Sequence, residues 1–183
     1  FDKGSGTPLE LGGGGLLPNT PLAHASGTIT VRSSTFSANV GASNAGDAIR
    51  VEDDEDIEIT HCAFADHASF AITLAESSSA SMGHSFLTRN GAGILVDTGH
   101  GATLASLGHN IGQLPTSMTA TGDLITTASL VGDLADRGGP APTYLPLAGG
   151  LLVDTGDAAL SGAPSTDQRG LARIVDGNND SSA

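Results

Sequence analysis

The stretch DIEITHCAFADHASFAITL (residues 56–74) is followed closely by SASMGHSFLTRNGAGILV (residues 79–96). The second stretch repeats the apolar pattern of the first with a period of 22 to 23. The recurring pairs are Phe64 and Phe86, Ile72 and Ile94, Leu74 and Val96, Ile57 and Ala80, and Ile59 and Met82. A period of this length indicates a repeat architecture, in which each copy packs against the next.

Each copy contains two short runs in which apolar and polar residues alternate, separated by a polar bend around a phenylalanine. Alternation over four or five residues predicts β-strands, and the period is too short for helical repeats of the ankyrin type. The pattern therefore predicts an all-β fold, a parallel β-helix (solenoid) whose coils each add one strand to two or three parallel sheets. Equivalent side chains of successive coils are then expected to stack inside the tube, Phe64 on Phe86 and Ile72 on Ile94.

Further coils are visible on both sides of this pair. Upstream, the match is longer by five or six residues, which fall in the Gly/Asn-rich loop GASNAG (41–46). Downstream, another coil is expected to begin at Ala102 and Leu104, which follow Ala80 and Met82 at the same period. The upstream matches are Ile29, Val31 and Phe36 with Ile57, Ile59 and Phe64, and Ile49 and Val51 with Ile72 and Leu74.

The chain is expected to form one elongated domain in three parts. Residues 1–27, with GGGG at 12–15 and three prolines, predict an irregular lead-in that covers the open N-terminal end of the stack. Residues 28–111 hold the coils, with their period of 22–23. Residues 112–183 lose the period and are rich in turns, which predicts a loop-rich C-terminal cap of the same domain.

Composition narrows the classes of partner. The formal net charge is −13, with seven Lys plus Arg against twenty Asp plus Glu, so nucleic acid and anionic membranes would be repelled. No stretch approaches the length of apolar sequence that a membrane span needs, and no membrane-spanning segment is expected. Cys62 is the only cysteine, which rules out an internal disulfide. Its place beside Phe64 predicts a small buried thiol.

TITVRSSTFSAN (28–39) is similar to the repeats of right-handed parallel β-helix surface proteins, including those of the polymorphic outer-membrane protein type. The motif is short and degenerate, and it recurs as HCAFADH and HSFLTRN, where a polar residue stands two positions after the phenylalanine. The resemblance implies that the coils wind right-handed.

The C-terminal part resembles that of bacterial β-helix surface proteins of the choice-of-anchor Q kind. This resemblance implies an exported protein, secreted or held at the bacterial cell surface, with a display or adhesive role more often than a catalytic one. The ordered motifs that carry it are SLGHNIG (106–112), TGDLITTASLVGDLADRGGPAPTYLPL (121–147), DTGDAA (154–159), TDQRGLAR (166–173) and VDGNND (175–180).

The leading functional hypothesis is therefore a non-catalytic extracellular or cell-surface structural or adhesive protein. Its partners would be surface glycans or proteins, or further copies of itself. If the Gly-rich lead-in of one molecule covers the exposed coil end of the next, a head-to-tail contact propagates a filament.

The alternative is a polysaccharide-active enzyme on the same scaffold, either a glycoside hydrolase or a lyase. Asp53 and Asp54, with His100 in Gly-His-Gly, resemble part of the active-site set of β-helical polygalacturonases. Paired carboxyl groups suit hydrolysis because one protonates the leaving oxygen and the other activates water. A lyase would instead need a basic group to abstract a proton, and the candidates outside the lead-in are Arg32, Arg50 and Arg89.

Two acidic stretches are candidate sites for a structural Ca²⁺, because calcium prefers carboxylate and amide oxygens. The same acids would otherwise be solvated turn residues. The six histidines are scattered without helical pairing, so zinc is not expected. Asp167-Gln168-Arg169 is interpreted as structural, with Arg169 clamping Asp167. The candidate calcium ligands are Asp53, Asp54, Asp56, Asp176, Asn178 and Asp180.

Overall fold

The computed structural model describes residues 9–11, 28–40, 47–157, 163–173 and 175. These residues are almost entirely strands and turns, with one 3₁₀ turn, η1 (Thr98–His100). The strands are β1 (Leu9–Leu11), β2 (Thr28–Arg32), β3 (Thr35–Ser37), β4 (Ile49–Val51), β5 (Asp56–Thr60), β6 (Ala63–Ala65), β7 (Phe70–Leu74), β8 (Ser79–Gly83), β9 (Phe86–Thr88), β10 (Ala92–Val96), β11 (Thr103–Gly108), β12 (Ile111–Gly112) and β13 (Leu124–Ile125).

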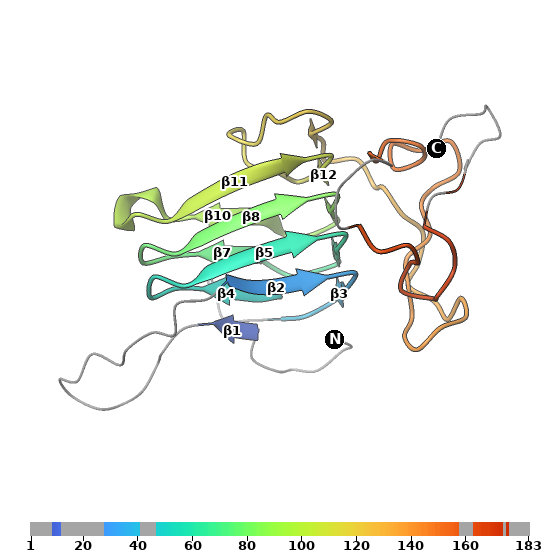
Figure 1. Cartoon of the computed structure of the whole chain (residues 1–183), viewed down its shortest axis with the longest axis horizontal. Helices are drawn as coiled ribbons and strands as arrows, with labels where there is room; N and C mark the ends of the chain where they lie inside the picture. The colour runs from blue at the N-terminus through green and yellow to red at the C-terminus, as the bar shows by residue number, and fades with distance from the viewer. Residues whose placement is uncertain (1–8, 12–27, 41–46, 158–162, 174, 176–183) are drawn as a thin grey trace.

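The strands form three sheets in which all neighbouring strands are parallel. From β1 to β12 successive strands enter the three sheets in turn, so that each circuit of the chain adds one strand to each sheet (Figure 1), and β13 then extends the third sheet. The prediction of an all-β fold with parallel sheets is confirmed. The strand orders are β1-β4-β7-β10, β11-β8-β5-β2 and β13-β12-β9-β6-β3.

Most of the predicted stacking is observed. Ile72 lies in register with Ile94, and Ile57 lies in register with both Ile29 and Ala80. These side chains alternate inward along their strands, and together they build one apolar core. The fully buried members of that core include Ile49, Ile57, Ile59, Phe64, Ile72, Leu74, Met82 and Leu87.

The predicted contact of Phe64 with Phe86 is wrong by one residue. Phe64 is in register with Leu87, and Phe86 with Ala63, because the repeat in this sheet is one position longer than the match of the two phenylalanines implies. A shift of one residue turns a side chain to the other face of a strand. Phe64 therefore stacks on Phe36, with ring centroids 4.9 Å apart, whereas the partly buried Phe86 packs in a second cluster outside the coils.

The predicted start of the last coil is also wrong, by two residues. Leu104, and not Ala102, lies in register with Ala80. The turn before β11 contains η1 and is two residues longer than the turn before β8, since Val96 is level with Leu74 while Thr103 is level with Ser79. The insertion displaces the strand without disturbing the pairing.

Buried polar side chains connect the coils at the bend that enters the third sheet. The backbone N–H of Cys62 donates to Ser85 Oγ (3.0 Å), and that of Ser85 donates to Asn110 Oδ1 (3.3 Å). The N–H of Asn110 in turn donates to Asp123 Oδ1 at 3.0 Å. Each side chain thus satisfies a buried donor that the sheet ladder leaves unpaired.

A second series of this kind follows the exit from the third sheet. The N–H of Asn39 donates to His67 Nδ1 (3.2 Å), that of His67 to Asn90 Oδ1 (3.1 Å), and that of Asn90 to Gln113 Oε1 (2.8 Å). Asn90 also donates from Nδ2 to the carbonyl of Phe64 at 3.2 Å. The two series fix the height of each coil on its neighbour.

Segments that precede and follow the coils lie against them. Of the predicted lead-in, residues 9–11 form β1, which pairs in parallel with β4, while residues 1–8 and 12–27 lie outside the described residues. After β13 the chain leaves the stack and runs beside the sheet that contains β3 (Figure 1). We refer to described residues 126–157, 163–173 and 175 as the C-terminal segment. In the part of the chain that the structure describes, no helix is long and apolar enough to cross a membrane.

The register can be tested with a pair of alanine variants. Phe64→Ala removes a fully buried ring and is expected to lower the free energy of unfolding by about 3–5 kcal/mol. Phe86→Ala, at a partly buried ring outside the main core, is expected to cost less than half as much. Urea unfolding followed by circular dichroism measures both, and equal losses would contradict the observed register.

The polar series gives a second prediction. Asn110 is fully buried, accepts from Ser85 N–H, and donates from Nδ2 to the carbonyl of Met82 at 2.9 Å. Asn110→Ala leaves both groups unpaired and is expected to lower the free energy of unfolding by about 3 kcal/mol. The control Ser79→Ala, which removes an exposed hydroxyl contact with Asp56, is expected to change it by about 0.5 kcal/mol. A loss for Asn110→Ala no greater than for the control would show that the series is not stabilising.

Candidate functional site

The C-terminal segment and the coils enclose a cavity of about 660 Å³. The cavity is partly open to solvent, and one side is formed by the bends that lead into β6, β9 and β12, with His61, His84 and His109. The opposite side comes from the C-terminal segment, including Tyr144 and Arg173. The volume is in the range of small-molecule sites.

The three histidines occupy equivalent places in successive coils, and their rings are stacked. Ring centroids are 5.2 Å apart for His61 and His84, and 4.9 Å apart for His84 and His109. All three residues have positive φ, between +50° and +57°. Histidine is one of the residues that tolerates this left-handed conformation. The N–H of His61 donates to the carbonyl of Gly83 (3.2 Å) and that of His84 to the carbonyl of Gly108 (3.0 Å), which holds the bends one above another.

These histidines look scattered in the sequence, and the structure brings three of them together. The separation of His61 from His84 matches the coil period, which was a usable signal. The separation of His84 from His109 is two positions longer and hides the third ring, because the last coil carries the two-residue insertion at η1.

The surroundings of the stack favour neutral imidazole. Burial lowers the pKa of His61 to about 4, helped by the nearby charges of Arg173 and His84. Burial is also the main cause that lowers the pKa of His84. His61 Nδ1 and His84 Nε2 are buried and have no hydrogen-bond partner among the described residues. Protonation would therefore bury charged N–H groups that have nothing to bond.

Face-to-face stacking does not suit metal binding, because the ring nitrogens then lie in roughly parallel planes and do not converge on one point. Within the described residues, no three His, Cys, Asp or Glu side chains gather in a way that could hold a metal ion.

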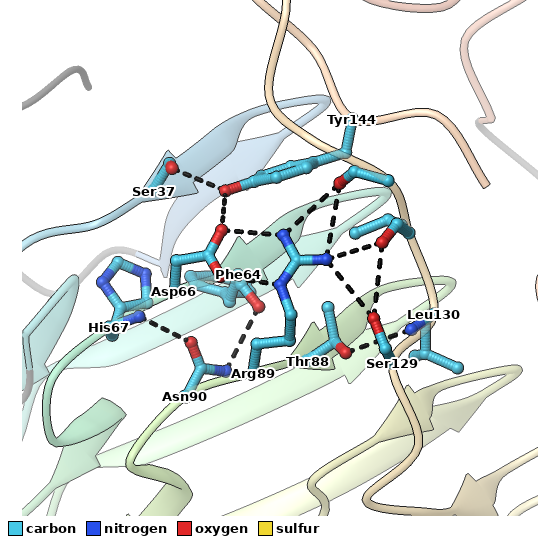
Figure 2. Close-up of polar contacts among 12 residues, drawn as sticks. Ser37, Phe64, Asp66, His67, Thr88, Arg89, Asn90, Ser129, Leu130 and Tyr144 are labelled. Carbon is cyan, nitrogen blue, oxygen red and sulfur yellow. Dashed lines mark hydrogen bonds and ion pairs between the residues drawn. The ribbon is translucent and has the colours of Figure 1, made fainter. Parts of the chain in front are cut away.

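A polar cluster beside the cavity attaches the C-terminal segment to the coils (Figure 2). Arg89 donates to both carboxylate oxygens of Asp66, at 2.7 and 2.8 Å, and to the carbonyl of Val131 at 2.6 Å. Tyr144 donates its hydroxyl to Asp66 Oδ2 at 2.6 Å, and its oxygen lies 2.6 Å from Ser37 Oγ. The cluster of Asp66, Arg89 and Tyr144, which we refer to as the latch, thus joins two coils to two points of the segment.

The groups of the latch stabilise one another's charge states. The hydrogen bonds from Arg89 hold the pKa of Asp66 below its usual value. Burial, together with the hydrogen bond to Asp66, raises the pKa of Tyr144 to about 12. The guanidinium carbon of Arg89 also lies 5.5 Å from the centre of the Tyr144 ring, within the range of a cation–π contact. The latch therefore keeps its charges at neutral pH.

Two further contacts fix the end of the C-terminal segment to the first coil, and a third stabilises the segment itself. Thr35 Oγ1 donates to Gln168 Oε1 at 2.8 Å, and Arg173 donates to Ser33 Oγ at 2.9 Å. Arg169 donates to Asp167 Oδ2 at 2.8 Å. This geometry agrees with the structural interpretation of Asp167-Gln168-Arg169.

The candidate catalytic residues lie at a different corner of the coils and do not form one cluster. Asp53 and Asp54 occupy the turn between β4 and β5, and the N–H of Asp54 donates to the carbonyl of Glu76 in the next coil. His100 lies one coil further and pairs with Asp97 at 2.7 Å. The structure instead places Asp53 against Glu76, and a hydrogen bond between the two raises the pKa of Glu76. Sequence reasoning missed this pair because it spans two coils.

The other candidate residues are placed as follows. Asp56 accepts the hydroxyl hydrogen bond of Ser79, while Asp176, Asn178 and Asp180 lie outside the described residues, so calcium binding stays a prediction. Cys62 is buried as expected, and burial raises the pKa of its thiol to about 11. The three arginines considered for a lyase are each paired with a carboxylate: Arg32 with Glu58, Arg50 with Glu52 and Arg89 with Asp66.

Comparison with known proteins found no matching family model, no matching curated protein and no matching solved structure.

The latch gives a testable prediction. Arg89→Ala removes the partner of Asp66 and the bond to Val131, and is expected to raise hydrogen exchange about tenfold or more in residues 129–146, since charged hydrogen bonds contribute about 1.5–3 kcal/mol. Arg50→Ala is the matched control, because Arg50 pairs with Glu52 at 2.7 Å on a sheet that does not carry the segment. Equal exchange in the two variants would mean that the latch does not hold the segment.

Proposed function

We propose that this chain is a right-handed parallel β-helix that works outside the cell or on its surface as a non-catalytic structural or adhesive protein. The parallel sheets, to which each circuit adds one strand apiece, support the coil architecture. The right hand and the export rest on the resemblance of residues 28–39 and of the C-terminal motifs to surface proteins. The strongly acidic composition is compatible with a solvated extracellular surface.

One observation carries the adhesive role. The sheet β11-β8-β5-β2 is not the one that the C-terminal segment follows (Figure 1). Its outward-facing positions form two rows in which every residue except Ala105 is polar. Because inward and outward residues alternate, the rows repeat at the strand spacing and form a flat contact surface. We refer to this surface as the polar face. Its rows are Thr28, Asp56, Ser79 and Thr103, and Thr30, Glu58, Ser81 and Ala105.

A flat surface of hydroxyls and carboxylates favours partners that offer many hydrogen bonds, such as surface glycans or proteins. Other copies of the chain are a further class of partner. The edge strands β11 and β13 each pair on one side only among the described residues, so a second molecule could extend these sheets head to tail.

A second candidate, a polysaccharide-active enzyme, is favoured by the pairing of Asp53 with Glu76. Glu76 lines a small hollow of about 290 Å³ together with Arg50, Asp97 and His100. A carboxyl group with a raised pKa beside a second carboxylate is the arrangement that general acid catalysis of glycoside hydrolysis uses.

Binding to glycan and protein arrays, run beside an assay for reducing ends released from polysaccharides, separates the two candidates. The wild type is expected to bind at least one surface glycan or protein and to release no reducing ends. Thr30→Arg with Thr103→Arg crowds the polar face and is expected to weaken binding at least tenfold. Asp133→Arg, an exposed change on the C-terminal segment with the same gain of charge, is expected to leave binding unchanged.

Three results would overturn the adhesive proposal: binding to none of the arrayed partners, equal weakening by the two charge variants, or release of reducing ends by the wild type. In the last case, loss of that release in Glu76→Gln would support the enzyme instead.

A further inference from the structure

The imidazole stack lies at the junction between the coils and the C-terminal segment. His109 Nδ1 is 2.8 Å from the carbonyl oxygen of Thr155, and a Cβ placed on Gly156 would lie 3.9 Å from His84 Nδ1. Arg173, which is bonded to Ser33 in the equivalent bend of the first coil, faces His61. All three levels of the stack therefore lie beside the segment, and His109 contacts it directly.

We propose that the stacked rings of His61, His84 and His109 form an acid-sensitive contact, and that protonation of His61 and His84 releases residues 154–157 and 163–173 of the C-terminal segment from the coils. The release would open the cavity described above. The release depends on the contacts of the stack and on no particular ligand or partner. The proposal is therefore independent of the proposed surface role.

The geometry makes the stack intolerant of charge. Rings at these separations would place like charges side by side, and Arg173 adds a cation beside His61. The Nε of Arg173, like one nitrogen each of His61 and His84, is buried without a hydrogen-bond partner among the described residues. Protonation of His61 Nδ1 or His84 Nε2 would therefore create an N–H group that has no acceptor within hydrogen-bond distance in the present arrangement.

The other charged groups near the stack do not offset the cost of protonating His61 and His84. Arg169 is paired with Asp167, and Arg32 with Glu58. Asp123 accepts hydrogen bonds from the coil bend and from Ala120. Asp154 also lines the cavity. Asp157 favours protonation of His84, yet the pKa of His84 stays below its usual value because burial and the neighbouring His109 outweigh it.

The sign of the pH effect follows from the direction of these shifts. The attached state binds protons less readily than the released state, so attachment is complete above pH 6.5, the ordinary pKa of histidine, and weakens as the pH falls toward about 4, the pKa of His61 when attached. The latch survives in this window, because Arg89 holds the pKa of Asp66 below 3.8. His67 also has a pKa lowered by burial, and its Nδ1 accepts from the N–H of Asn39 in the neighbouring coil.

Two measurements distinguish release of the segment from opening of the latch. Hydrogen exchange in residues 154–157 and 163–173, corrected for the pH dependence of the intrinsic rate, is expected to rise about tenfold or more between pH 7.5 and 4.5, the change that one pKa unit supports. Tyr144 is the only tyrosine and the chain has no tryptophan. Because a hydrogen bond to a carboxylate quenches tyrosine emission, its fluorescence reports separately whether the latch opens.

Asparagine is the matched substitution, since it accepts positive φ and does not titrate. The triple variant H61N/H84N/H109N is expected to change exchange in the segment less than threefold over the same pH range. H100N is the control, because His100 is exposed at another corner of the coils, and it is expected to behave as the wild type. Should the triple variant lose its strand signal in circular dichroism at pH 7.5, H84N alone removes the central ring and is expected to reduce the pH effect.

Unchanged protection of the segment in the wild type at pH 4.5 would overturn the proposal. So would equal loss of protection in the wild type and in the folded triple variant. Neither result would bear on binding by the polar face, which is measured at neutral pH.

Discussion

The structure depends on a single requirement: every backbone N–H that a coil buries must find an acceptor in the next coil. Along the strands the parallel ladders meet it. At the two bends around the third sheet the ladder is interrupted, and side-chain oxygens of Ser85, Asn110 and Asn90 supply the acceptors instead. A side chain one residue out of place would leave a buried donor unpaired, at a cost of about 1–3 kcal/mol. Coil height is thereby set by polar residues, while apolar residues fill the space between.

The same requirement determines what the bends can carry on the outside. A bend residue that donates its N–H to the coil above takes a positive φ, as Ser33, His61, His84 and His109 do. Their side chains then point in a common direction at the coil spacing, which is how three imidazoles come to stack at 5.2 and 4.9 Å. At the other end of β6 and β9 the same geometry places Asp66 beside Arg89. The stack and the latch are therefore products of the coil repeat, used to attach a segment that has no repeat of its own.

The core strands were predictable from the sequence because long apolar side chains mark their inward positions. Ile72 and Ile94 could hardly be aligned otherwise. The three-residue strands gave weaker information. In β9, Phe86 and Leu87 are both apolar. The sequence alignment matched Phe64 with the larger Phe86, although Leu87 is the buried residue in register with Phe64. The register of β11 was missed because the length of the turn before it leaves no hydrophobic signal in the sequence. The cavity and the latch were missed because Tyr144 and Ser37 stand 107 residues apart, beyond any local pattern.

The contact of Arg173 with Ser33 joins residues 140 positions apart, whereas neighbouring strands within a sheet are separated by 22 to 28 positions over most of the stack. Coils can thus assemble from local contacts, one upon another, while the closing of the C-terminal segment must wait for nearly the whole chain. A growing chain would expose the outer side of its third sheet until the C-terminal segment has been synthesised. The histidines and Phe86 would spend that interval in water. The C-terminal segment is therefore expected to fold after the coils on which it packs.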